Sequence, residues 1–119
     1  MDLRDEKKHV QLVGNAEAAL AELESQVKAH SPPKKPDAQL IGSVLRVLDL
    51  LKSSPFIGTN VQQKRWPRGF KGLPNLFRME LSQSWRLLYY VVGDETKIVC
   101  VVFEIRDDKY GELFDYPKK

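Results

Sequence analysis

The chain has 119 residues, one cysteine and a net charge of +3; 42% of its residues are hydrophobic and 29% are charged. This length suits a single domain over residues 1–119, and the composition excludes a mostly disordered chain. No apolar run approaches the roughly 20 residues of a membrane-spanning helix, and the charged N-terminus lacks the apolar segment of a secretory signal. We therefore expect a cytoplasmic protein, with Cys100 as a buried apolar residue.

The N-terminal part predicts a short strand and then a helix. Residues 8–13 alternate as a strand that ends at Gly14, and Asn15 is suited to cap a helix that ends near His30. Apolar residues at helical spacing give this helix one buried stripe, which consists of Ala16, Ala19, Leu20, Leu23 and Val27.

A second helix follows a proline-rich loop over residues 31–36. Asp37 can cap this helix, which runs to about Ser53 and is stopped by the proline at position 55. Residues 56–72 then predict a long irregular connection rich in basic residues and glycine. The expected buried face of the second helix consists of Leu40, Ile41, Val44, Leu45, Leu48 and Leu51, with Val47 and Leu50 widening it.

Three strands follow this connection. Residues 76–81 alternate between apolar and charged side chains, and residues 82–84 predict a turn. Residues 85–92 predict a second strand, and a loop at residues 93–95 joins it to a third strand at 97–104, so that the two form a hairpin.

The end of the chain predicts a short helix. Asp107 or Asp108 can cap it, and Tyr110, Leu113 and Phe114 recur at helical spacing. The order of elements is thus β-α-α-β-β-β with a short C-terminal helix. This order indicates an α+β domain, in which two N-terminal helices pack on one face of a small, mainly antiparallel sheet.

Positive charge is concentrated in one part of the sequence. Residues 1–60 hold eight basic and eight acidic residues, whereas residues 61–86 hold six basic residues and one acid, Glu80. Such a stretch is typical of a surface that binds nucleic acid or an acidic protein, and it is also compatible with a solvated face. The six basic residues are Lys64, Arg65, Arg68, Lys71, Arg78 and Arg86.

Arg86 stands near the start of an otherwise apolar strand. Burying an unpaired guanidinium costs several kcal/mol, so the strand either pairs it with a carboxylate, such as Glu80 or Glu104, or keeps it for an anion. The sequence has no Cys/His cluster and no glycine-rich phosphate loop, which argues against a metal site or a nucleotide cofactor.

Four segments, in this order, resemble the RelE/ParE toxin superfamily of prokaryotic toxin–antitoxin systems. They are residues 50–56 (LLKSSPF), 70–81 (FKGLPNLFRMEL), 85–89 (WRLLY) and 104–114 (EIRDDKYGELF). The resemblance covers roughly residues 10–116. It implies a RelE-like toxin, a ribosome-dependent endoribonuclease that cleaves messenger RNA without a metal or other cofactor. The implied partners are a cognate antitoxin, messenger RNA and the ribosome.

The resemblance also implies a set of catalytic residues. Arg86 matches the strand arginine of the family, and Arg78 and Arg106 match other cationic positions. Glu80 stands where relatives often carry a basic residue; it would act as a base, or neutralise a neighbouring arginine. Tyr110 lies near a C-terminal Tyr or His of the family, and it either acts on the RNA or packs in the core.

The basic connection has an implied role in RNA binding. Lys64, Arg65, Arg68 and Lys71 would contact the ribosomal RNA backbone, which gives affinity without sequence information. Trp66 would either stack on a base or pin the loop to the domain. Two alternatives stay open. One is a non-catalytic or ParE-like member that inhibits DNA gyrase or binds only antitoxin or DNA, and the other is an unrelated basic RNA-binding domain.

Overall fold

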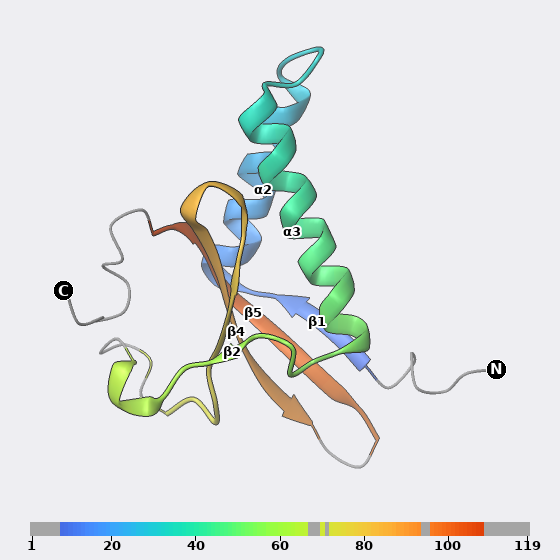
Figure 1. Cartoon of the computed structure of the whole chain (residues 1–119). Coiled ribbons are helices and arrows are strands. Elements are labelled where there is room, and N and C mark those ends of the chain that lie inside the picture. The colour runs from blue at the N-terminus through green and yellow to red at the C-terminus, as the bar shows by residue number, and fades with distance from the viewer. Residues whose placement is uncertain (1–7, 67–69, 71, 94–95, 109–119) are drawn as a thin grey trace.

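The computed structural model describes residues 8–66, 70, 72–93 and 96–108. Within these residues the chain is an α+β domain with two helices and one five-stranded sheet, as the sequence predicts in outline (Figure 1). The elements are β1 (Lys8–Leu12), α2 (Gly14–Lys28), α3 (Lys35–Ser53), β2 (Thr59–Asn60), the 3₁₀ turn η1 (Gln63–Arg65), β3 (Phe77–Glu80), the 3₁₀ turn η3 (Ser82–Ser84), β4 (Trp85–Gly93) and β5 (Ile98–Asp107).

The sheet has the strand order β1-β5-β4-β3-β2. The pairs formed by β2, β3, β4 and β5 are antiparallel, whereas β1 runs parallel to β5 at one edge. The β4–β5 ladder shifts register between Leu88 and Tyr89, because Leu88 lies opposite Glu104 and Tyr89 lies opposite Val102, which leaves Phe103 as the extra residue of a bulge. The last strand extends to Asp107, three residues beyond the end expected from the sequence.

The helix starts differ from the expected ones. Asn15 lies inside α2, and its side-chain oxygen accepts a hydrogen bond from the Ile105 N–H at 3.1 Å, so a tertiary contact uses the group expected to cap the helix. Asp37 lies in the first turn of α3, which begins at Lys35, with a proline among its first residues. There Asp37 stands where the helix dipole favours a negative charge.

The main core lies between the two helices and one face of the sheet. Buried residues of α2 and α3 share one cluster with alternate residues of β3, β4 and β5. Leu45 and Leu50 were expected in this core but are exposed, Leu45 by 52%. They lie outside the stripe that faces the sheet, which consists of Leu40, Val44, Val47 and Leu51.

The opposite face of the sheet carries a smaller apolar cluster. The connection between β2 and β3 folds over part of this face, and Val61 and Leu76 are buried there against Leu88. Partly buried Phe70 and Phe103 meet edge to face in the same cluster, with ring centres 5.1 Å apart. We call this side of the sheet, beyond the cluster, the open face.

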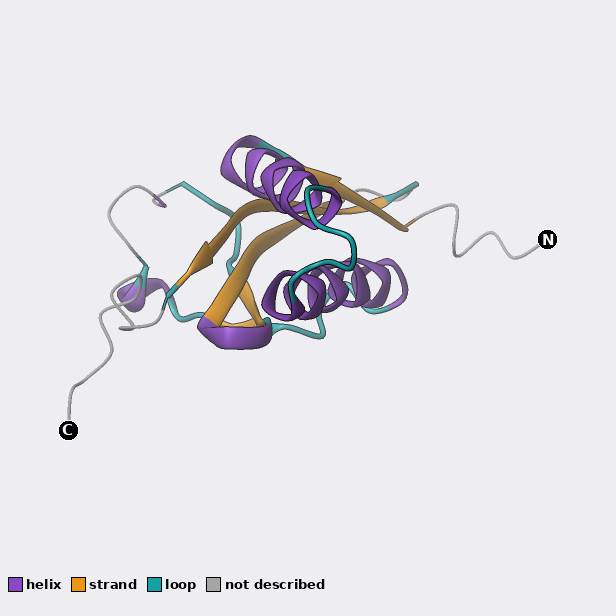
Figure 2. Ribbon diagram, turned by 90° about the horizontal axis from the view of Figure 1, so that it is seen from above, coloured by secondary structure: helices purple, strands orange, loops and turns teal. Residues whose placement is uncertain are grey.

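Figures 1 and 2 show how the layers lie. The helices stand side by side, and the loop that joins them is the part farthest from the sheet. The turn η3 lies beside the start of α3, seen from above in Figure 2, where Gln83 donates to the Pro36 carbonyl at 2.7 Å. Among the described residues no helix is long and apolar enough to cross a bilayer. The expected C-terminal helix falls on residues outside this description.

Candidate functional site

Charged side chains form a row across three strands of the open face. Arg86 on β4 lies opposite Glu80 on β3 and opposite Arg106 on β5. Residues directly opposite in a ladder project from the same face. Arg78 lies on this face as well, opposite Leu88, and is thus a diagonal neighbour of Arg86. The sheet therefore brings together four of the five residues that the sequence nominated as catalytic.

Two carboxylates hold the Arg86 guanidinium. Its Nη1 donates to Glu80 Oε1 at 2.7 Å, and its Nε donates to Asp108 Oδ2 at 2.9 Å. Burial works to lower the pKa of Arg86, but the hydrogen bonds to Glu80 and Asp108 outweigh it and raise the pKa above its usual value. Of the two alternatives for Arg86, pairing with a carboxylate is observed in the protein alone, and Glu80 is one of the partners. Glu104 lies in the next row, opposite Leu88.

The two carboxylates differ in their surroundings. The Asp108 side chain is 2% exposed, that of Arg86 is 19% exposed, and that of Glu80 is 70% exposed. An exposed ion pair contributes about 0.2–1 kcal/mol and is screened by salt, whereas removing one partner of a buried pair costs about 3–5 kcal/mol. Asp108 is thus the fixed inner partner of Arg86, and Glu80 is an outer partner that a ligand can displace.

The turn η3 positions Asp108. The Asp108 N–H donates to the Ser84 carbonyl at 3.0 Å, and the Ser84 hydroxyl donates to Asp107 Oδ1 at 3.0 Å. Gln83 and Ser84 have φ values of 61° and 65°, which residues other than glycine rarely adopt. Such backbone strain persists only where the surrounding structure holds it, and it clusters at functional sites.

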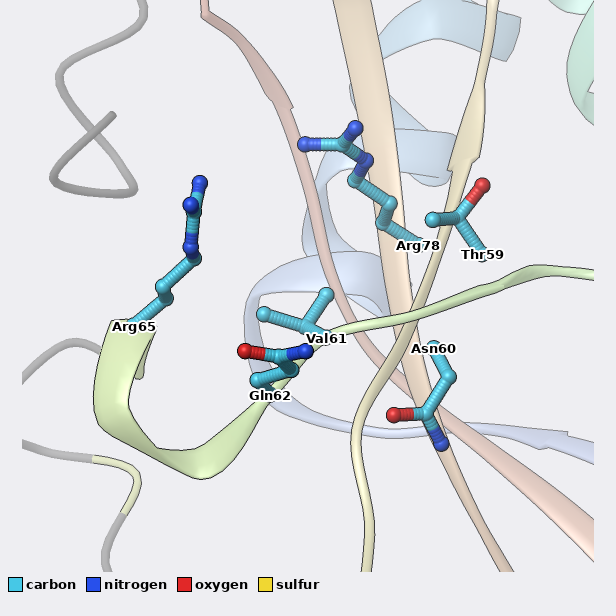
Figure 3. A pocket seen from close by; sticks show the side chains of 6 residues that line it. All are labelled: Thr59, Asn60, Val61, Gln62, Arg65 and Arg78. Atoms are coloured by element: carbon cyan, nitrogen blue, oxygen red, sulfur yellow. The ribbon is translucent and has the colours of Figure 1, made fainter. Parts of the chain in front are cut away.

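Next to Arg78 the open face is hollowed. A cavity of about 220 Å³ lies between the β2–η1 segment and β3, with Arg65 and Arg78 rising on two sides of it (Figure 3). Burial lowers the pKa of Arg78, and the charges of Arg86 and Arg65 act in the same direction, against those of Glu80 and Asp108. The cavity is lined by Thr59, Asn60, Val61, Gln62, Arg65 and Arg78.

The remaining nominated residues are spread more widely. Lys64 is exposed on η1 and does not line this cavity. Arg68, Lys71 and Tyr110 lie outside the described residues. Trp66 pins the loop, because its indole N–H donates to the Val61 carbonyl at 2.8 Å and its ring packs on the smaller cluster.

Sequence reasoning missed several residues of this face. The sequence suggested Asp108 as a possible cap of the C-terminal helix and not as a partner of Arg86, although an arginine in an apolar strand requires a nearby carboxylate. Thr59, Asn60 and Gln62 gave no signal, because β2 has two residues and no alternating pattern. Among the described residues there is no group of three or more His, Cys, Asp or Glu that could hold a metal ion.

Comparisons of the chain with protein-family models, with curated proteins and with solved structures found no match. The function must therefore be argued from the residues of the open face and from the sequence pattern that resembles the RelE/ParE superfamily.

Proposed function

We propose that this domain is a RelE-like toxin that cleaves messenger RNA in the ribosome, without a metal, and that an antitoxin neutralises it. The observation that carries the proposal is the row of Glu80, Arg86 and Arg106 across the open face, with Arg78 as the diagonal neighbour of Arg86. RNA cleavage by attack of the ribose 2′-hydroxyl needs a base and cations near the phosphate. The open face carries a carboxylate and three cations together.

The chemistry follows from these groups. A base takes the proton of the ribose 2′-hydroxyl, and the 2′-oxygen attacks the adjacent phosphorus as the bond from phosphorus to the 5′-oxygen breaks. The 5′-oxygen takes a proton from a water molecule, so the products are a 2′,3′-cyclic phosphate and a 5′-hydroxyl. Negative charge grows on the phosphoryl oxygens during the attack, and fixed cations stabilise that charge. We assign the base to Glu80 and the stabilising cations to Arg78, Arg86 and Arg106.

The Glu80–Arg86 pair supports this assignment. A phosphate can replace Glu80 on the guanidinium, because their pair is exposed and weak and because the planar guanidinium fork matches two phosphoryl oxygens. Asp108 keeps hold of Nε during the exchange. The displaced carboxylate then stays beside the bound sugar, where a general base is needed.

A second candidate is a non-catalytic or ParE-like member that inhibits DNA gyrase. The observation that favours it is that two carboxylates already bind the central arginine in the protein alone. A protein partner that recognises only the shape and charge of this surface can bind without breaking the ion pairs of Arg86.

Inducible expression in a bacterium separates the two candidates. The chain is compared with the variants Glu80→Gln and Arg86→Ala, and with Arg46→Ala as a control that removes an exposed cation from α3. Arg86→Ala also deprives buried Asp108 of its cation, so R86A/D108N, which removes both charges, shows whether any loss reflects unfolding. We expect growth arrest with rapid messenger loss for the parent and Arg46→Ala, and none for the other variants.

Purified protein with ribosomes and a programmed messenger tests the chemistry. Cleavage should leave a 2′,3′-cyclic phosphate, and a 2′-deoxy substitution at the cleaved nucleotide should abolish it. Glu80→Gln should lower the cleavage rate by about 10²–10⁴-fold, the usual contribution of a general base. Growth arrest with filamentation and intact messenger would refute the nuclease proposal and support the gyrase candidate, and full cleavage by R86A/D108N would refute the role assigned to Arg86.

A further inference from the structure

Hydrogen bonds hold the loop that borders the cavity beside Arg78. The Val61 N–H donates to the Leu76 carbonyl at 2.9 Å, and the Trp66 indole N–H donates to the Val61 carbonyl at 2.8 Å. The first bond ties the start of the segment that carries Arg65 to the residue before β3, and the second closes the segment on itself across η1, where the Trp66 ring packs on the smaller cluster. The fold therefore fixes the backbone of this segment relative to β3, which carries Arg78.

The lining combines two kinds of polar group. Arg65 and Arg78 border the cavity with positive charge, and Figure 3 shows their guanidinium groups extending along two sides of the open space. Gln62 carries a side-chain amide, with a hydrogen-bond donor and an acceptor. Val61 adds an apolar surface. The side chain of Asn60 points away from the two guanidinium groups in Figure 3, as its pairing with a residue of the main core requires. Cations suit a phosphate, whereas amides suit the polar edge of a base.

Electrostatics favour an anion in this position. The pKa of Arg78 is lowered first by burial and then by the nearby charge of Arg86, and Arg65 adds to this effect. Glu80 and Asp108 offset part of it. A phosphate between Arg65 and Arg78 would reduce the repulsion among the three guanidinium groups.

We propose that this cavity is a nucleotide subsite, which holds a phosphate between Arg65 and Arg78 and binds the edge of a single-stranded base through Gln62. The inference rests on the proposed function, because it places the occupant on the same RNA. Arg78 borders both the cavity and the Arg86 row, so the bound nucleotide would be a neighbour of the cleaved linkage. Base preference of the protein would then arise here, away from the reacting atoms.

The test measures binding without cleavage. Short RNA oligonucleotides that differ in one base, each carrying a 2′-O-methyl group at every position to prevent cleavage, are titrated by fluorescence anisotropy. Arg65→Ala is compared with Lys64→Ala, which removes the same charge from the same turn but does not line the cavity. Gln62→Ala is compared with Asn60→Ala, whose side chain points away from the two cations, and with Gln63→Ala, the neighbour that lies outside the cavity lining.

We expect Arg65→Ala to weaken binding on the order of tenfold more than Lys64→Ala, the scale of one good bidentate contact. Gln62→Ala should flatten the preference among bases, while Asn60→Ala and Gln63→Ala should keep it. Equal losses of affinity for Arg65→Ala and Lys64→Ala would overturn the inference, because they would indicate a general attraction of RNA to positive charge and not a specific site. Inorganic phosphate that competes as well as a nucleoside monophosphate would also overturn it, by reducing the cavity to an anion site.

This outcome is independent of cleavage. Base preference that depends on Gln62 in a protein that cuts no messenger would refute the nuclease proposal and support the subsite. Cleavage that depends on Arg86 with unchanged base preference in Gln62→Ala would support the nuclease proposal and refute the subsite.

Discussion

The two faces of the sheet are built from the same strands but hold opposite kinds of residue. On the covered face, Leu87, Tyr89 and Cys100 are fully buried beneath the helices. On the open face, Arg78 and Arg86 stand among carboxylates beside a small apolar cluster. Side chains alternate along a strand, so a single sequence of β4 supplies both. Stability is concentrated on the first face, and the charges available to a ligand are concentrated on the second.

The bulge in β5 makes this division possible near the site. If the same residues followed Val102 in regular alternation, with no bulge at Phe103, Ile105 would lie on the open face and Arg106 in the core. With it, Ile105 joins the main core opposite Leu87, and Arg106 lies opposite Arg86. One irregular position thus keeps both faces consistent.

The largest expected effect is on the free energy of unfolding, and it tests whether stability and RNA binding depend on different faces of the sheet. Leu87→Ala removes a fully buried side chain of the main core and should lower the free energy of unfolding by about 3 kcal/mol. Val92→Ala, on the same strand but 39% exposed, should cost about 0.5 kcal/mol. Urea denaturation measures both. RNA affinity per folded molecule should stay unchanged in Leu87→Ala, and a large loss of affinity would show that the faces are not independent.

The next effect tests the ion pair between Arg86 and the buried carboxylate of Asp108. Arg86→Ala leaves the buried Asp108 carboxylate without its bond to the guanidinium and should cost about 3 kcal/mol. Asp108→Ala should cost less, because Arg86 is more exposed and keeps Glu80. R86A/D108N should recover part of the stability but none of the activity. Thermal and urea unfolding measure the three variants, and equal costs for the two alanine variants would contradict the proposed order of inner and outer partner.

The covered face could largely be predicted from the sequence, and the open face only in part. The alternation of Phe77 and Met79 with Arg78 and Glu80 sets both faces of β3 without any knowledge of tertiary structure. Glu80 and Arg86 flank a tight turn, so their pairing across β3 and β4 is a local consequence. The position of Asp108 is not local, because it depends on the register of β5 after the bulge.

The helix ends and the cavity show the same limit. Asn15 has the chemistry of a helix cap, yet the Ile105 N–H from a distant strand uses its oxygen. The cavity forms because Val61, which follows β2, is hydrogen-bonded to Leu76 and Trp66. The spacing of residues in the sequence does not predict these bonds. Charge composition indicated Arg65 and Arg78, whereas the place of the Gln62 amide at the cavity could be found only from the fold.

A smaller effect concerns a polar group on the covered face. Tyr89 is fully buried, burial raises its pKa to about 12, and its hydroxyl oxygen accepts a hydrogen bond from the Gly58 N–H at 3.0 Å. Tyr89→Phe leaves that N–H without its acceptor and should cost about 1 kcal/mol in urea denaturation. Tyr90→Phe, on the open face, is the matched control and should cost less. An unchanged stability in Tyr89→Phe would mean that water satisfies the Gly58 N–H.

The smallest effect compares pH dependence at a single carboxylate of the open face. Burial raises the pKa of Glu104 above its ordinary value of 4.5, and Arg106 offsets part of this shift. The folded state therefore binds the Glu104 proton more tightly than the unfolded state does. Stability from this residue falls as pH rises through the interval between the two pKa values, and the penalty is complete above the folded-state pKa.

Glu104→Gln should thus raise the melting temperature near neutral pH and give no such gain below about pH 4, where both states are protonated. Glu24→Gln, at an exposed position of α2, is the control and should show no such difference between the two conditions. Thermal melts of the three proteins at both pH values measure the effect. A gain that is equal at both would show that packing, and not ionisation of Glu104, limits stability on the open face.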